Sequence, residues 1–196
     1  MSGILIVLSG PAGVGKGSIL RRAAAGLPNL ITSVSVTTRA PRRGEEEGRE
    51  YFFRTPAEFE RLVAEDAFLE WAGYLDCRYG TPRAWVLEQL GAGRDVVLEI
   101  EVKGAMQVRA RFPEAVLVFA VPPSFAELAA RLRKRATESE QMLQRRVAAA
   151  REELKHVGDY DYAIINDDLE QAAADFTAIV RAEHLRPRRL ALPPDL

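Results

Sequence analysis

The feature that most constrains the fold is a glycine-rich segment, residues 10–18, that lies between two regular patterns. The apolar, β-branched-rich run 4–8 precedes it and is typical of a buried strand. Residues 16–25, which follow, have the composition of a helix. A strand, a glycine-rich turn and a helix in this order bring backbone N–H groups and a helix N-terminus into one loop. Such a loop favours binding of phosphate.

The spacing within this segment matches a P-loop, with a first glycine, four further residues and then Gly15-Lys16. Glycines let the backbone approach phosphate oxygens closely, and the lysine reaches the outer phosphates. We expect ATP to contact the whole loop, which consists of Gly10, Pro11, Ala12, Gly13, Val14, Gly15, Lys16, Gly17 and Ser18. A P-loop usually has Ser or Thr after the lysine, where the hydroxyl helps to hold Mg²⁺. Here Gly17 takes that place, so Ser18 is the candidate for a metal contact, either direct or through water.

Apolar runs of strand length alternate with helical patterns along much of the remaining chain. The runs are 95–101, 115–121 and 162–165, and the helical patterns are 102–112 and 124–135. Strands that alternate with helices predict a mostly parallel sheet with right-handed crossovers and helices on both faces. We therefore predict the α/β class, with a P-loop core.

Two stretches interrupt this alternation. Residues from 33 to about 82 are polar and contain only short apolar segments, which favours an inserted lobe of mixed structure. The charged segment 133–140 interrupts a helical pattern that then restarts, as expected of a lid. The predicted division is a core of residues 1–33, 84–125 and 156–196, an inserted lobe of residues 34–83 and a lid region of residues 126–155.

Composition excludes several classes of function. The 27 basic residues nearly cancel the 28 acidic ones, so no overall charge indicates nucleic acid or a membrane as a partner. The single cysteine, Cys77, excludes a disulfide within the chain and a cysteine-based metal cluster, which suits a cytoplasmic location. His156 and His184 lack partners at metal-ligand spacing, so we interpret both as incidental. No pattern indicates an oligomeric state.

A series of short motifs extends over nearly the whole chain. They are Ser33-Val-Ser-Val-Thr-Thr-Arg39-Ala-Pro-Arg42-Arg-Gly44, Gly48-Arg-Glu-Tyr51-Phe-Phe53, Phe68-Leu-Glu70-Trp71, Tyr79-Gly80-Thr81, Leu98-Glu-Ile-Glu-Val-Lys-Gly104-Ala and Ile165-Asn166-Asp167-Asp168. In this order they resemble the signature of the guanylate kinase family. The resemblance implies a P-loop core with a GMP-binding lobe and a lid. It also implies transfer of the terminal phosphoryl group of ATP to GMP with Mg²⁺, giving ADP and GDP in purine nucleotide metabolism.

The lobe contains candidates for binding the phosphate of GMP. Arg39 and Arg42 provide planar forks that suit bidentate contacts with phosphate. Tyr51 and Tyr79 can add hydroxyl donors, and the resemblance places all four residues at the GMP phosphate. Taken singly, each would be better interpreted as a surface arginine or a core tyrosine. The clustering of these residues favours the binding site.

The base of GMP is best bound by a carboxylate side chain. Guanine presents N1–H and an exocyclic amino group side by side, and one carboxylate can accept from both. Glu70 is the candidate, and the resemblance adds Ser35 and Thr81 as hydroxyl partners of the base. A buried carboxylate left unpaired against adenine predicts strong rejection of AMP. Glu99 and Glu101 lie two apart on a predicted strand, so we expect both on one face, bordering the GMP site.

Phosphoryl transfer depends on alignment and on neutralisation of charge, and it requires no protein nucleophile. The resemblance implies that arginines of the lid region and of the helix after it close over the transferred group and exclude water. It also assigns Arg131 and Asn166 to ATP. The candidates for catalysis are Lys16, Arg39, Arg135 and Arg146.

Two other hypotheses compete with this interpretation. A P-loop kinase for another acceptor, such as a phosphorylated ribose, would lack the trio Ser35, Glu70 and Thr81, which is present. A binding module that has lost catalysis would have an eroded P-loop, whereas Lys16 and the lid arginines are present here.

Overall fold

Two sheets organise the chain in the computed structural model, which describes residues 3–74, 76–135 and 140–190 and only the backbone of 74, 134, 135 and 140–142. The larger sheet has five strands in the order β2-β7-β1-β8-β9, and every neighbouring pair is parallel. Its strands are β1 (Leu5–Ser9), β2 (Leu30–Thr32), β7 (Asp95–Glu99), β8 (Val116–Val121) and β9 (Tyr162–Ile165). The predicted α/β class with a parallel sheet is thus confirmed.

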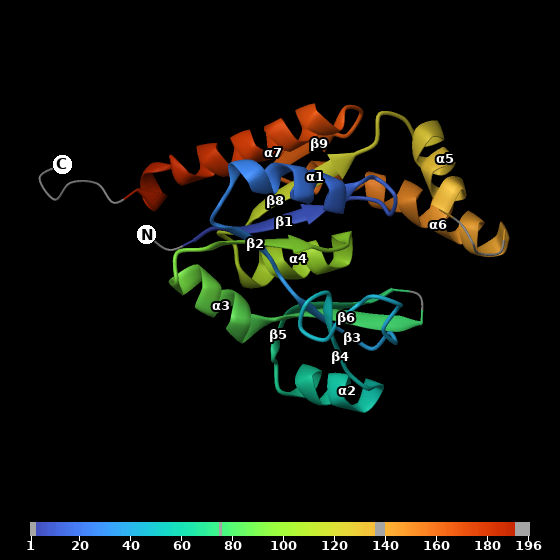
Figure 1. The fold of residues 1–196 in the computed structure, drawn as a ribbon, viewed down its shortest axis with the longest axis horizontal. Helices are drawn as coiled ribbons and strands as arrows, with labels where there is room; N and C mark the ends of the chain where they lie inside the picture. Colours follow the sequence, from blue (N-terminus) through green and yellow to red (C-terminus); the bar gives the residue numbers. More distant parts are fainter. Residues whose placement is uncertain (1–2, 75, 136–139, 191–196) are drawn as a thin grey trace, which may run out of the picture.

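Helices cover both faces of this sheet, with α1 (Lys16–Ala23) and α7 (Leu169–His184) on one side and α3 (Arg83–Gly91) and α4 (Val102–Arg111) on the other (Figure 1). Side chains of β1 alternate between the two layers. Ile6 and Leu8 join the cluster of α1 and α7, while Val7 joins that of α3 and α4. Because both faces are buried, this strand is an unbroken apolar run in the sequence.

The smaller sheet has the order β4-β3-β6-β5 and is mixed, because β3 pairs with β4 in parallel and with β6 antiparallel. Its elements are β3 (Ser35–Thr37), β4 (Tyr51–Phe53), α2 (Pro56–Ala64), β5 (Phe68–Tyr74) and β6 (Cys77–Pro82). Helix α2 covers one face of this sheet, where Phe59 stacks on Phe68 with ring centroids 4.7 Å apart. The other face carries polar side chains and is free to border a site.

A bulge in β5 determines which side chains reach that polar face. Phe68 is paired with Pro82, but Glu70 is paired with Thr81, so two steps along β5 match one step along β6. In a regular strand Phe68 and Glu70 would share a face, whereas the bulge places them on opposite faces. Phe68 therefore packs under α2 while Glu70 points away from it.

Helices α5 (Phe125–Arg135) and α6 (Glu140–Leu154) lie at one end of the larger sheet (Figure 1). Their apolar side chains, among them Leu128 and Leu143, join the cluster that buries α1. Short 3₁₀ turns occur at Ala24–Gly26, Val157–Asp159 and Pro187–Arg189. Within the part of the chain that the structure describes, no helix has the length and apolar character needed to cross a membrane.

A buried carboxylate, Asp95, lies at the start of β7, between β2 and β1 in the larger sheet. Asp95 accepts a hydrogen bond from the Ile4 N–H at 2.9 Å, and its other oxygen lies 2.7 Å from Nε2 of His184. His184 thus connects the end of α7 to the start of β7. Among the described residues, no group of three or more His, Cys, Asp or Glu is placed so that it could hold a metal.

One predicted element needs correction. The predicted strand 95–101 ends at Glu99, and Glu101 is instead the N-cap of α4. The chain must leave the sheet here to begin the helix that crosses its face. The reason given for placing Glu99 and Glu101 on one side was therefore wrong, although both residues line the same cavity.

Candidate active site

A cavity of about 350 Å³ lies where the loop after β1, the polar face of the smaller sheet and α6 meet. Half of the residues predicted for the site line it. Its lining consists of Gly10, Ala12, Lys16, Ser35, Arg42, Tyr51, Glu70, Ala72, Tyr79, Glu99, Ile100, Glu101, Arg146 and Glu153. Groups predicted for the donor and for the acceptor thus line one cavity.

The glycine-rich loop leaves the N-terminus of α1 open. Gly15 is the N-cap, with a φ of 102° that only glycine adopts without strain, and no side chain caps the helix. The ammonium of Lys16 folds back and donates to the Gly10 carbonyl oxygen at 2.6 Å. Burial lowers the pKa of Lys16, and the nearby carboxylates of Glu99, Glu153 and Glu101 oppose this shift. The uncapped N–H groups and the lysine together form a positive, anion-binding loop.

Asn166 and Arg131, the two residues predicted for ATP outside the loop, support the loop from its outer side. Asn166 Nδ2 donates to the Val14 carbonyl oxygen at 2.7 Å. Arg131 Nη1 donates to the backbone carbonyl of Asn166 at 3.3 Å, and its Nε donates to Glu127 at 2.9 Å. Gly15 fits against Asn166, because a Cβ on it would lie 2.5 Å from Nδ2.

Two further arginines, Arg135 and Arg146, were predicted to close over the transferred group. Arg146 reaches the cavity from α6. Arg135 is the last residue of α5, and its side chain lies outside the described residues, as do Ala136 and Thr137.

Glu153 of α6 also lines the cavity, although the sequence did not single it out. Its position seven residues after Arg146, two helical turns along one face, is the signal that could have revealed it. Burial raises the pKa of Glu153, and Lys16 opposes this shift.

The polar face of the smaller sheet follows from strand register. Ser35 is paired with Tyr51, Glu70 with Thr81 and Ala72 with Tyr79. Directly paired side chains share a face, so hydroxyls from adjacent strands gather beside the Glu70 carboxylate. The rings of Tyr51 and Tyr79 meet edge to face with centroids 5.9 Å apart. Burial raises the pKa of Tyr51, which keeps its hydroxyl protonated as a donor.

Glu70 is the most unusual ionisable group of this face. Its residue is 3% exposed, and the Thr81 hydroxyl donates to its Oε1 at 2.6 Å. Burial raises the pKa of Glu70 to about 7; the Glu101 carboxylate adds to this shift, and the hydrogen bonds from Thr81 oppose it. Such a carboxylate gains from a ligand that donates two hydrogen bonds, because the hydrogen bonds from Thr81 offset its desolvation only in part.

Arg39 lies beside the cavity rather than on its lining. Its guanidinium carbon is 5.4 Å from the Tyr51 ring centroid, within the range of a cation–π contact. Arg39 Nη2 donates to Glu45 Oε1 at 2.8 Å, and the Arg42 N–H donates to Glu45 Oε2 at 2.7 Å. These donors hold the pKa of Glu45 below its usual value. Glu45, which the sequence does not single out, is thus the anion that this turn holds within the chain.

A second hollow of about 260 Å³ borders the loop, where Ser18 and Glu99 supply oxygen atoms. Ser18 Oγ accepts a hydrogen bond from Arg21 Nη2 at 3.1 Å. Glu99 Oε2 lies 3.1 Å from the point where a Cβ of Gly17 would be. The glycine that replaces the usual hydroxyl residue thus leaves room for a carboxylate. These oxygens fit Mg²⁺, which commonly takes one or two protein ligands together with substrate phosphates.

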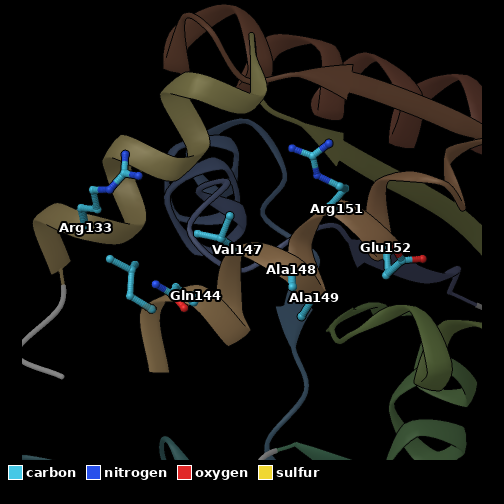
Figure 2. A pocket seen from close by; sticks show the side chains of 8 residues that line it. Arg133, Gln144, Val147, Ala148, Ala149, Arg151 and Glu152 are labelled. Carbon is cyan, nitrogen blue, oxygen red and sulfur yellow. The ribbon is translucent and has the colours of Figure 1, made fainter. Parts of the chain in front are cut away.

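A third hollow, of about 490 Å³, lies between α5 and α6 and is separate from this chemistry. Figure 2 shows its labelled side chains on these two helices, with Arg133 on α5 and Gln144 and Val147 on α6. None of the residues predicted for the site lines it. Size alone therefore does not distinguish the candidate site, whereas the convergence of charged groups does.

The parallel sheet, the anion-binding loop after its central strand and the attached polar lobe define the class of P-loop nucleotide kinases. The family model described as guanylate kinase matches residues 2–183. The chain therefore belongs to the guanylate kinase family.

Individual relatives agree with this assignment. The chain is 49% identical to a guanylate kinase of Caldanaerobacter subterraneus subsp. tengcongensis over 95% of this chain and 91% of that protein. It is 47% identical to a guanylate kinase of Bacillus subtilis over 96% of this chain and 93% of that protein. The crystal structure of guanylate kinase from Anaplasma phagocytophilum matches it with a TM-score of 0.78 at 33% identity, covering 96% of this chain and 89% of that one.

Proposed function

We propose that this chain transfers the terminal phosphoryl group of ATP to GMP, giving ADP and GDP. The observation that carries the proposal is the single cavity in which Lys16 of the P-loop faces Glu70 and Tyr79 of the smaller sheet. Family membership supports the reaction, because curated relatives of nearly the same length carry the name guanylate kinase.

ATP occupies the loop of residues 10–18, where N–H groups and Lys16 surround its phosphates. Lys16 leaves the Gly10 carbonyl, its partner at 2.6 Å in this structure, to neutralise charge on the migrating group. Asn166 contacts the adenine ring of ATP. Arg131, Arg135 and Arg146 close over the transferred group from the predicted lid region, which excludes water.

GMP occupies the polar face of residues 34–83. Its guanine donates N1–H and the amino group to Glu70, and Ser35 and Thr81 complete the contacts with the base. Its phosphate replaces the carboxylate of Glu45 as the anion held by Arg39. The remaining groups around GMP are Arg42, Tyr51, Tyr79, Glu99 and Glu101.

Ser18 and Glu99 are the residues that would hold Mg²⁺, either directly or through water. The ion supplies positive charge that offsets the charge of the ATP phosphates. Gly17 lacks a side chain, so the Glu99 carboxylate can take the place of the usual hydroxyl.

An assay of ADP release with ATP, Mg²⁺ and each of GMP, AMP, CMP and UMP tests the proposal. We expect rapid turnover with GMP alone among the four acceptors, because only guanine presents two adjacent donors to Glu70. Absence of GMP-dependent ADP release would overturn the proposed reaction. Equal rates with AMP and GMP would leave the reaction class intact but remove the role given to Glu70.

A further inference from the structure

A glycine at the start of α4 adjoins the carboxylate of Glu70. Gly104 is buried in the first turn of this helix. A Cβ at this position would lie 2.5 Å from Glu70 Oε2, 3.2 Å from Glu70 Cδ and 3.2 Å from Ile100 Cδ1. Cβ atoms do not approach other heavy atoms to 2.5 Å, so an alanine here requires a neighbour to move.

Glu70 and Ile100, the two residues next to Gly104, are each held by a hydrogen bond to another strand. The Thr81 hydroxyl donates to Glu70 at 2.6 Å from the paired strand, and Glu70 is buried between the sheet and α4. The backbone carbonyl of Ile100 accepts a hydrogen bond from the Ser9 hydroxyl at 2.7 Å, which anchors the chain just before α4. A side chain at position 104 therefore acts on the Glu70 carboxylate, turning it away from its bond with Thr81.

Backbone conformation does not explain the glycine. The φ of Gly104 is outside the left-handed region, so any L-residue could adopt it. Alanine is also the better helix former. Space for the Glu70 carboxylate is the explanation that the structure offers.

We infer that Gly104 is a positioning residue for acceptor specificity, because its missing side chain lets α4 approach closely enough to hold the Glu70 carboxylate against the guanine site. The inference rests on the proposed role of Glu70 in binding GMP. It adds a residue that touches no substrate but determines where the base-reading oxygens lie.

Steady-state kinetics of Gly104→Ala test this role. Displacement of a binding group by an ångström or less typically costs up to about 100-fold, so we expect the KM for GMP to rise roughly 10- to 100-fold. The KM for ATP and the kcat at saturating GMP should stay close to wild type. Gly91→Ala is the matched control, because a Cβ on this glycine of α3 meets nothing within 4 Å, and it should leave the KM for GMP unchanged.

A second pair of variants keeps the test independent of folding defects. Glu70→Asp shortens the acid by one methylene, so its carboxylate vacates the space beside position 104. If Gly104 acts through the Glu70 carboxylate, the two substitutions are coupled and their effects should not add. Adding Gly104→Ala to the Glu70→Asp protein should then raise the KM for GMP less than about threefold. An equally large rise in both backgrounds would show that Gly104 does not act through Glu70 and would overturn the inference.

The outcomes separate this inference from the proposed function. A wild-type protein without GMP-dependent turnover contradicts the function itself. A wild-type protein that turns over GMP, with a Gly104→Ala variant of unchanged KM for GMP, contradicts only the role of Gly104. If Gly104→Ala fails to fold, the double variant with Glu70→Asp decides, since relief of the contact should restore a folded protein.

Discussion

The P-loop and the polar face of the smaller sheet border one cavity, yet they are built by different means. The loop offers backbone N–H groups, shaped by glycines such as Gly15, and one lysine. The polar face offers side chains, and its central group is a carboxylate whose pKa burial raises to about 7. Backbone donors do not titrate, whereas a buried acid does. Sensitivity to the identity of the base should therefore lie on the acceptor side, where titration of Glu70 should also make GMP binding depend on pH.

The first helix of each region shows the same contrast. Helix α1 begins at Gly15 without a side-chain cap, so its N-terminus is open to an anion. Helix α2 begins with a complete capping box, in which Thr55 and Glu58 bond to each other's backbone N–H groups. One helix terminus is left without a side-chain cap, and the other is closed by its own side chains. The following variants test this division, from the largest expected effect to the smallest.

Lys16→Ala should have the largest effect and should act on the donor side. Removal of one preorganised positive group commonly lowers kcat by roughly 100- to 1000-fold, and the KM for GMP should change little. The comparison protein is Lys155→Ala, which removes an exposed lysine paired with Glu152 and should behave as wild type. An ADP-release assay measures both. A rise in the KM for GMP as large as the fall in kcat would break the separation of the two sides.

Arg39→Ala should act on the acceptor side. Loss of a charged hydrogen-bond partner costs about 1.5–3 kcal/mol, so the KM for GMP should rise roughly 10- to 100-fold while the KM for ATP is unchanged. Arg49→Ala is a matched control, because this exposed arginine of the same lobe pairs only with nearby Glu46 and Glu50 among the ion pairs described. Unchanged GMP kinetics in Arg39→Ala would show that its ion pair with Glu45 is purely structural.

The pH dependence of GMP binding should report Glu70. Its pKa of about 7 in the ligand-free protein means that protonated Glu70 accumulates below neutrality. Since guanine requires the ionised form, GMP affinity should fall by up to about tenfold per pH unit below 7. Calorimetric titration of GMP without ATP measures this trend. Glu70→Gln keeps the titration of the GMP phosphate but lacks the acid, so an equally steep trend in this variant would exclude Glu70 as its cause.

Thr55→Ala should give the smallest effect. Removal of an N-cap threonine lowers the free energy of unfolding by about 1 kcal/mol, so the urea midpoint should fall. The KM for ATP should not change, because α2 faces away from the P-loop (Figure 1). A change in the KM for ATP would show that the two regions are more strongly coupled than their separate construction indicates.

Local patterns in the sequence were sufficient for much of this protein. The loop of residues 10–18 is contiguous, so its spacing and its flanking strand and helix could be recognised directly. The apolar runs 115–121 and 162–165 predicted β8, which is buried on both faces, and the edge strand β9 to within a residue. The acceptor residues are dispersed, and they were found because the order of their motifs resembles one family.

Tertiary structure decided the features that depend on contacts between distant segments. The bulge in β5 turns Glu70 to the cavity, and the start of α4 makes Glu101 an N-cap rather than a strand residue. The partners of Arg39 and Lys16, and the close approach of Gly104 to Glu70, also appear only in the folded chain. Periodicity and motif spacing depend only on residues that are near one another in the sequence, so they predict local structure. Distances, burial and pKa values depend on which surfaces pack together.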